Sequence, residues 1–503
     1  MTTNDRAAAL PRLDRSTVLP AGVGHPDPAP TSVGIVHLGI GAFHRAHQAV
    51  CTEDAARATG DTRWGILGVT QRSRTVVDQL APQGGRYGLL STEHDETSLR
   101  VVGAVVDVAS PGETARVLET IAAPTTHVVT LTVTEKGYTR TGDGSLDLAA
   151  VRADLDALVA EDRATPATSA VGMLVRGLAA RHAAARRTSD GLPLTVLSCD
   201  NLTDNGRVLG RLVREAVDAA LPGRAGDPLR AWIAASVTFP CSMVDRIVPA
   251  TTPAHHELAQ EIGGFRDEGL VAAETFFQWV VEDDFAGPRP AWERAGATIT
   301  GDVLPYERAK LRMLNGTHSI LAYAGALAGR TTIAEVVGDA AVMEHADAHL
   351  EREAPATLDG SPLDLPAYAA ALRARFANPA TGHTTVQVAM DGTQKIPVRW
   401  GGVLAERVAA GQVPDGATYG LAAWALFVVR ATLDAAHAAE LADPRADELR
   451  ALVRAADGDV EAAVRSLVAL PGLLPDALGE HPDVVAAVLA HAATLRAHVP
   501  LAV

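Results

Sequence analysis

The stretch Val33-Gly-Ile-Val-His-Leu-Gly-Ile-Gly-Ala-Phe-His44 decides the fold of the first half of the chain. Its first six residues are mostly apolar, which predicts a short buried strand that leads directly into glycines. Gly39 permits a tight turn, and Gly41 lets the backbone approach a pyrophosphate. The helix expected next offers unpaired N–H groups to phosphate oxygens. We therefore predict a phosphate-binding loop formed by Gly39, Gly41, Ala42, Phe43 and His44.

Further short apolar runs follow this loop at residues 64–69, 127–133, 193–197 and 232–239. Helix-like segments rich in Ala, Leu and Arg, such as 146–159 and 170–186, separate them. Strands that alternate with helices are typical of βαβ units and predict a parallel sheet. His44 stands where the usual fingerprint has a third glycine, so an ordinary strand-to-helix turn stays the alternative for the loop.

The character of the sequence changes after Arg289-Pro290. Residues 303–355 and 401–500 have the spacing of amphipathic helices, whereas residues 384–390 are β-like and precede the turn pair Asp391-Gly392. We therefore predict an α/β fold with two domains. A Rossmann-type nucleotide-binding domain with a mostly parallel sheet takes residues 1–290, and a mainly α-helical substrate domain takes 291–503. The cleft between two such domains is the expected place for a substrate.

Composition limits the partners of the chain, which has 503 residues and a formal net charge of −16. A surface this acidic lacks the basic face that nucleic acid requires, and it disfavours anionic membranes. The three cysteines lie far apart, so neither a zinc site nor a disulfide framework is indicated. The first 20 residues lack the apolar core of a signal peptide, and the longest apolar stretch, near 420–429, is too short to span a bilayer. We expect a cytoplasmic protein that is a monomer or a small homo-oligomer.

The residues after the second predicted strand bear on the choice of nucleotide. That strand is expected to end at Val69-Thr70, and Gln71-Arg72-Ser73-Arg74 follows. Many NAD enzymes have an acidic residue here that binds the ribose, and this chain has none. Arg72, with its two neighbours, suits the 2′-phosphate of NADP, but solvated residues at the start of a helix would look the same. NAD and NADP both stay open on these residues.

Residues 307–319, Glu-Arg-Ala-Lys-Leu-Arg-Met-Leu-Asn-Gly-Thr-His-Ser, carry the most informative polar pattern. On a continuous α-helix, Glu307, Lys310, Asn315 and His318 fall within an arc of roughly 140° and face one cleft. Two leucines share this arc, and an apolar setting lowers the pKa of a lysine. Such a lysine can take a hydroxyl proton while hydride leaves the same carbon. On spacing alone, a solvated helix face with a Glu307–Lys310 ion pair is the competing interpretation.

Several segments, in this order, resemble the mannitol dehydrogenase family of polyol and sugar-acid dehydrogenases. The resembling segments are residues 39–47, 134–138, 198–202 with 205–206, 237–249 and 310–318. The resemblance runs to about Trp400 and so covers most of the chain. It implies a metal-independent, NAD(P)-dependent dehydrogenase that interconverts a polyol or sugar acid with its keto form. We expect NAD as cofactor, with NADP as the alternative.

The resemblance also implies roles for individual residues. Lys310 would be the general acid and base, Asn201 and Asn315 would form an oxyanion pocket, and His318 would orient the substrate. Glu307 would gate proton exchange between the lysine and solvent. Asp245 would bind the substrate or order the site, and Thr134 and Glu135 would bind the cofactor. Asn201 follows a β-run at a carboxyl strand end, where such folds place ligands.

The substrate is indicated by segments that resemble the uronate-reducing branch more than the mannitol branch: residues 315–318, 375–379 and 389–397. Lys395 and Arg399 follow the Asp391-Gly392 turn and suit a substrate carboxylate, although solvated loop cations are an equal alternative. Our first choice is reduction of D-fructuronate to D-mannonate, and the alternative is mannitol–fructose interconversion. A catalytically silent nucleotide-binding sensor and a metal-dependent polyol dehydrogenase are the competing classes.

Overall fold

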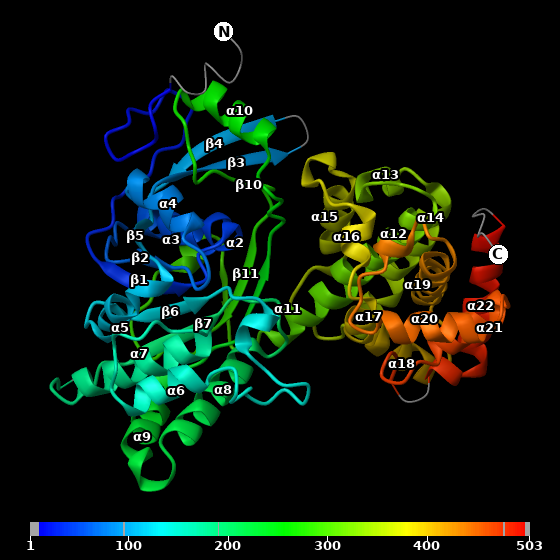
Figure 1. Cartoon of the computed structure of the whole chain (residues 1–503). Coiled ribbons are helices and arrows are strands. Elements are labelled where there is room, and N and C mark those ends of the chain that lie inside the picture. Colours follow the sequence, from blue (N-terminus) through cyan, green and yellow to red (C-terminus); the bar gives the residue numbers. More distant parts are fainter. Residues whose placement is uncertain (1–9, 94–95, 190, 476–477, 498–503) are drawn as a thin grey trace. The chain divides into compact units, whose positions relative to one another are not determined.

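A six-stranded parallel sheet is the centre of the first part of the computed structural model, which describes residues 10–93, 96–189, 191–475 and 478–497 (Figure 1). Its strands are β1 (Val33–Leu38), β2 (Gly65–Val69), β5 (Val105–Ala109), β6 (Val128–Leu131), β7 (Leu194–Ser198) and β8 (Val237–Thr238). Across the sheet they run β5-β2-β1-β6-β7-β8, and all neighbours are parallel. This is the doubly wound Rossmann order, whose direction reverses between β1 and β6. The predicted α/β fold is confirmed.

The strands of this sheet are apolar because helices or further strands cover both of its faces. On one face, Val36 and Leu38 of β1 belong to a core shared with α5 (Thr114–Ala122), α7 (Ala170–Ala185) and α8 (Asn205–Ala220). On the other, Ile35 belongs to a second core with α3 (Gln48–Thr59). Alternate residues of one strand therefore serve two separate cores. The remaining helices of this part are α2 (Ala42–Ala46), α4 (Thr75–Leu80), α6 (Arg152–Val159), α9 (Asp227–Ser236) and α10 (Pro253–Gly263).

Two smaller sheets complete the first unit, which runs from Met1 to Val303. One contains the hairpin β3 (Tyr87–Glu93) and β4 (Glu96–Val102) with β10 (Val271–Ala273); the other contains β9 (Ser242–Asp245), β11 (Gln278–Glu282) and β12 (Thr298–Thr300). β12 pairs with β11, which itself pairs with β9. The first unit therefore extends past residue 290, where the sequence changes character.

Two predicted strands are wrong. Most of residues 232–239 belongs to helix α9, which begins at Asp227-Pro228 and buries Leu229 and Ile233, four residues apart; only Val237 and Thr238 form a strand. Residues 384–390 contain the short helix α16 (Thr385–Ala389), because the Thr384 hydroxyl accepts a hydrogen bond from the backbone N–H of Gln387 and caps it. A capping threonine thus outweighs the β-propensity of its β-branched neighbours.

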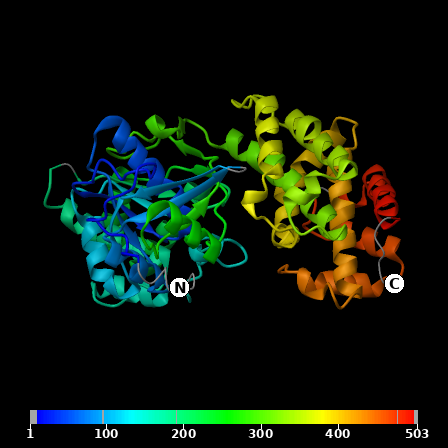
Figure 2. The same ribbon diagram turned by 90° about the horizontal axis from the view of Figure 1, so that it is seen from above.

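The second unit, Leu304–Val503, is built from helices, as the sequence predicts. In chain order they include α11 (Leu304–Ala309), α12 (Gly316–Leu327), α13 (Ile333–Val337), α14 (Ala340–Ala348), α15 (Leu365–Ala377), α16, α17 (Gly392–Ile396), α18 (Gly402–Ala409), α19 (Asp415–Leu433), α20 (Ala446–Ala455), α21 (Val460–Val468) and α22 (Pro482–Arg496). Figure 2 shows them after a 90° turn, with α22 in red at the edge of this unit in both views.

Helix α19 is the core of the second unit. Every residue from Gly416 to Ala431 is buried, and α12, α14, α20, α21 and α22 pack against it. By length and composition this helix could cross a membrane, yet 89% of its most apolar window is buried inside the structure. It is therefore a central helix that is buried on every side, whereas the sequence predicts an amphipathic helix here.

The amino end of α19 is capped from a neighbouring π-helix, His349–Glu353. The carboxylate of Glu353 accepts hydrogen bonds from the backbone N–H groups of Gly416 (2.8 Å) and Ala417 (3.2 Å). A buried helix end cannot leave these N–H groups unpaired, and a negative charge there also favours the helix dipole. Glu353 thus allows a fully buried helix to begin inside the protein.

In the first unit, the buried Arg181 of α7 joins three segments near the amino ends of the central strands. Its guanidinium donates to the carbonyl oxygens of Leu192 (2.8 Å), Pro193 (2.9 Å), Ile121 (2.6 Å) and Ala123 (3.0 Å). One side chain therefore binds four backbone acceptors, of which the Ala123 carbonyl also accepts from the Thr126 N–H.

Replacing Arg181 should destabilise the first unit. Arg181→Met removes the four donors but keeps the side-chain length, and we expect a loss of about 3 kcal/mol of unfolding free energy. Chemical denaturation followed by circular dichroism measures the shift. Arg186→Met, an exposed position at the end of the same helix, is the control. Equal denaturation midpoints for the two variants would contradict this role.

Candidate active site

The loop after β1 packs against the chain after β6, at the point where the strand order reverses. Gly39 has a φ of 100°, and a Cβ added there would lie 2.2 Å from the carbonyl oxygen of Thr132, so only glycine fits. The Thr132 hydroxyl donates to the Gly39 carbonyl at 2.9 Å and fixes the approach. Gly41 is exposed, and a Cβ there would meet only the Gly39 carbonyl oxygen, at 3.8 Å. The loop therefore leaves open space where a doubly wound sheet places a phosphate.

Beneath this loop lie two stacked histidines. The rings of His37 and His44 are 3.3 Å apart and nearly parallel, and both are buried. His37 is held by the hydroxyls of Thr130 (2.7 Å) and Thr132 (2.9 Å). Burial lowers the pKa of His37 to about 3 and that of His44 well below its ordinary value, so both rings are neutral at pH 7. The His44 ring thus supports the loop from inside, and only its backbone is on the side of a ligand.

The other residues predicted at the loop are more accessible. Ala42 and Phe43 are half-buried, and the Phe43 ring stacks on His47 at 5.0 Å between centroids. Arg72 is exposed after β2, as is Arg74, which pairs with Asp78 at 3.5 Å. Arg72 therefore has the exposure that a ribose-phosphate contact requires, and a solvated cation at this position would have it too.

The carboxylate of Asp200 joins the ends of β6 and β7. It accepts hydrogen bonds from the backbone N–H groups of Val133 (3.1 Å) and Thr134 (2.8 Å) and from the hydroxyl of Tyr138 (2.9 Å). Thr134 has φ 65° and ψ 164°, a conformation that costs a residue other than glycine about 1–3 kcal/mol. Asp200 offsets that strain. The backbone of Glu135 follows in the short helix Glu135–Tyr138, while its side chain lies outside the described part of the structure.

Asn201 and Asp245 come from segments that the structure brings together. Asn201 is exposed directly after Asp200, at the carboxyl end of β7. Asp245 is buried at the end of β9. The Ser242 hydroxyl donates to the Ser198 carbonyl at 2.6 Å, and the Asn205 amide donates to the carbonyls of Asp200 (3.0 Å) and Ser242 (2.8 Å). β9 is thereby fastened to the strand end that carries Asn201.

In the second unit, residues Lys310–Asn315 form a π-helix between α11 and α12. The Gly316 N–H donates to the carbonyl of Leu311, five residues earlier, as π-helical geometry requires. The continuous α-helix expected over this segment, and with it the arc of roughly 140° that places four polar groups on one face, is therefore wrong. Lys310 is buried here, whereas Glu307, Asn315 and His318 are half-buried.

Side chains from distant segments stabilise this π-helix. The His349 ring donates from Nε2 to the carbonyl of Arg312 at 2.9 Å, and the Trp400 indole donates to the carbonyl of Gly316 at 3.1 Å. Widening a helix displaces carbonyls from their usual partners, and these two donors satisfy them. A Cβ on Gly316 would lie 2.5 Å from the His349 Nε2 atom, which explains a glycine inside the helix.

His318 lies among cations. Its ring stacks on His383 (5.3 Å between centroids) and contacts Phe376 (5.4 Å). Burial lowers its pKa well below the ordinary value, and the charges of His383, Arg399, Arg375 and Lys395 lower it further. The ring is therefore neutral at pH 7, in a neighbourhood that favours an anion. The sequence assigns no role to Arg375 or His383, because neither is adjacent to the lysine segment.

The two predicted cations differ in how they are held. Arg399, in the π-helix Pro397–Gly401, donates from Nη1 to the Ser319 hydroxyl at 2.5 Å, and burial lowers its pKa to about 10. Lys395, in α17, donates to the Val388 carbonyl at 3.3 Å. Both are ordered by neighbouring segments, and the structure thus favours positioned cations over freely solvated ones.

Models of two known domains match the chain: "Mannitol dehydrogenase Rossmann domain" over residues 33–294 and "Mannitol dehydrogenase C-terminal domain" over 302–494. D-mannonate oxidoreductase of Escherichia coli is 37% identical over 468 residues, 91% of this chain and 92% of that protein. An uncharacterized oxidoreductase of the same organism is 40% identical over 90% of each chain. Among solved structures, a Pseudomonas fluorescens mannitol 2-dehydrogenase in ternary complex with NAD and D-mannitol is 32% identical, with a TM-score of 0.77 over 96% of this chain and 97% of that one.

Enlarging Gly316 should disturb the π-helix. Gly316→Ala places a methyl group against the His349 ring, and we expect a loss of about 2 kcal/mol of stability from overpacking. Gly338→Ala is the control, because its Cβ would make an ordinary 3.5 Å contact at a φ of −74°. Thermal unfolding of the two variants measures the difference. If both unfold at the same temperature, the close approach of His349 does not constrain this segment.

Proposed function

The chain belongs to the mannitol dehydrogenase family, and from this premise we propose that it reduces D-fructuronate to D-mannonate. It is an oxidoreductase that acts on CH–OH groups, with NAD as cofactor. The proposed reaction adds a hydride to the C5 keto carbon of fructuronate and a proton to the keto oxygen, which yields the hydroxyl of mannonate. The proposal includes a metal-independent mechanism, a cytoplasmic location, and a monomeric or small homo-oligomeric enzyme.

The cofactor would lie against the loop of Gly39 and Gly41, where the open space above Gly41 fits a pyrophosphate. Bound nicotinamide supplies the hydride in the reducing direction. The loop contributes backbone N–H groups, and Asp200 holds the Thr134 segment that borders it. Arg72 is the residue that would favour NADP, and we keep NADP as the alternative.

Lys310 is the proposed proton donor to the keto oxygen. It is buried, whereas Lys136 is exposed and Lys395 half-buried, so it is the lysine that a reaction shielded from water would use. Asn315, five residues after Lys310 at the other end of the π-helix, would donate a hydrogen bond to the developing oxyanion, together with Asn201. Glu307 is half-buried and would pass protons between the lysine and solvent.

The observation that carries the choice of a sugar acid is the cationic neighbourhood of His318. A polyol such as mannitol has no negative charge to offset several buried or half-buried cations, whereas a uronate has one carboxylate. Arg399 offers a planar fork that matches a carboxylate, and Lys395 offers a second positive charge. His318 and Asp245 would bind the hydroxyl groups. The similarity to D-mannonate oxidoreductase supports the same choice.

The mannitol–fructose reaction is the second candidate, because a relative of known structure is a mannitol 2-dehydrogenase with D-mannitol bound. A silent nucleotide-binding sensor would not need a buried lysine beside an asparagine and a histidine. A metal-dependent polyol dehydrogenase would lose its activity on dialysis against a strong chelator, and the proposed mechanism would not.

Replacing the lysine tests the mechanism. We expect Lys310→Met to lower kcat about 100-fold or more, because the keto oxygen loses its proton donor, while NADH binding measured by fluorescence stays unchanged. Arg308→Met removes an exposed cation from the preceding helix and should keep full activity. Normal turnover by the Lys310 variant would refute the assignment.

Replacing the arginine tests the substrate. Fructuronate and fructose are assayed in parallel, each with NADH and with NADPH, and we expect fructuronate with NADH to be preferred. Arg399→Met should raise KM for fructuronate roughly tenfold to 100-fold, because a charged hydrogen bond is lost, and change KM for fructose little. A preference for fructose, or an equal effect on both substrates, would argue against the carboxylate site.

A further inference from the structure

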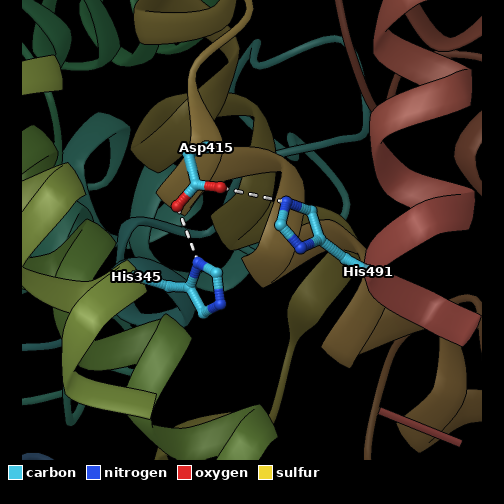
Figure 3. Close-up of side chains that lie close together, drawn as sticks. All are labelled: His345, Asp415 and His491. Carbon is cyan, nitrogen blue, oxygen red and sulfur yellow. Dashed lines mark hydrogen bonds and ion pairs between the residues drawn. The ribbon is translucent and has the colours of Figure 1, made fainter. Parts of the chain in front are cut away.

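Three helices of the second unit bring two imidazoles and one carboxylate together (Figure 3). His345 lies in α14, Asp415 is the first residue of α19, and His491 lies in α22. His345 Nδ1 is 2.6 Å from Asp415 Oδ2, and His491 Nε2 is 3.3 Å from Asp415 Oδ1. One ligand atom from each residue lies within 4.8 Å of the other two. The family resemblance assigns no role to any of these residues.

The two imidazoles are held in place by Tyr419, one turn after Asp415 on α19. Its ring stacks on His345 at 4.0 Å between centroids and meets His491 edge-on at 5.6 Å. The two histidine rings lie 5.0 Å apart at an angle of 80°. The side chains of His345, Asp415 and His491 are 22%, 49% and 17% exposed, so solvent reaches the cluster from one side. The two imidazoles are thus ordered by packing, and the cluster is accessible to solvent.

We propose that His345, Asp415 and His491 bind a divalent transition-metal ion of the Zn²⁺ or Co²⁺ type, which fastens α22 to the core helix α19. Imidazole nitrogen and carboxylate oxygen are ligands that Zn²⁺ takes, and three protein ligands with one water complete a tetrahedron. Metal–ligand bonds of about 2.0–2.1 Å place ligand atoms roughly 3.3 Å apart. His491 Nε2 already lies at this spacing from Asp415 Oδ1. His345 Nδ1 contacts the other carboxylate oxygen, Oδ2, at 2.6 Å and must move away by about 0.7 Å for both imidazoles to bind the ion.

The charges around the cluster suit a cation. The carboxylate of Glu353, which caps α19 beside Asp415, adds a second negative charge. Burial lowers the pKa of His491, Asp415 and Glu353 raise it, and His345 lowers it, with burial the largest influence. We assign the ion a structural role, since the proposed proton transfer uses Lys310 on a different element.

The test uses the full-length protein, freed of metal with a chelator that is then removed. Titration with CoCl₂ should produce the visible absorption of tetrahedral Co²⁺ at one ion per chain, and ZnCl₂ should displace it and raise the unfolding temperature. Asp415→Asn and His491→Gln keep side-chain size and should each weaken Co²⁺ binding about tenfold or more. His437→Gln is the matched control: this half-buried histidine lies 2.7 Å from Glu440 and 3.9 Å from Asp434, and should leave binding unchanged.

Absence of a Co²⁺ spectrum in the unmodified protein would overturn the proposal, as would equal binding by the Asp415 and His437 variants. Circular dichroism of the metal-free variants shows whether each folds, and two independent substitutions keep the test decisive if one does not. Fructuronate reduction is measured separately. If fructuronate is not reduced, the proposed function is refuted and the metal result stands. If the metal does not bind, the metal site is refuted and the proposed function stands.

Discussion

The hydrogen bond from the His349 ring to the carbonyl of Arg312 is the contact on which the second unit depends. It allows residues 310–315 to leave α-helical geometry without a buried carbonyl losing its partner. The other ring nitrogen of His349 lies 3.4 Å from the carboxylate of Glu353, which caps the core helix. The lysine segment and the start of α19 therefore each bind a side chain of the same π-helix, His349–Glu353. Gly316 and Gly416 lack side chains because His349 lies against both.

In the first unit, a single carboxylate, that of Asp200, holds two polar segments together. Asp200 joins the chain after β6 to the end of β7, and it holds Thr134 in a conformation that threonine does not adopt unaided. The same segment continues into Asn205, which reaches β9. Each unit thus arranges its polar residues through a buried acid that bonds to backbone N–H groups. Hydrogen bonds to an ionised carboxylate are stronger than those between neutral groups. Each of these acids therefore holds its backbone segment firmly in place.

The sequence predicts an element well when the residues that determine that element lie close together along the chain. The strand and loop at 33–44 were predictable because turn, glycines and apolar run lie within a dozen residues, and the helix at 170–186 because its pattern is continuous. The π-helix was not predictable, because His349 and Trp400, which donate hydrogen bonds to carbonyls in and directly after it, are far away in sequence. The strand predicted at residues 384–390 is wrong because the hydroxyl of Thr384 caps a helix there.

The candidate site shows the same division. Lys310, Asn315 and His318 could be proposed from one short segment and its resemblance to a family, and their roles stay predictions. Arg375 and His383 became candidates only once folding placed them near His318. The cluster of His345, Asp415 and His491 joins residues 70 and 76 positions apart, a spacing that corresponds to no motif.

The buried position of α19 has a consequence for how the protein is made. During synthesis this helix leaves the ribosome before α20, α21 and α22, the segments that cover much of it. Until about 60 further residues have followed, a helix that is apolar on every face lacks its partners, and exposed apolar surface of this size promotes aggregation. A chain that stops short of α22 therefore leaves part of α19 uncovered, and we expect such a product to aggregate rather than to act as a smaller enzyme.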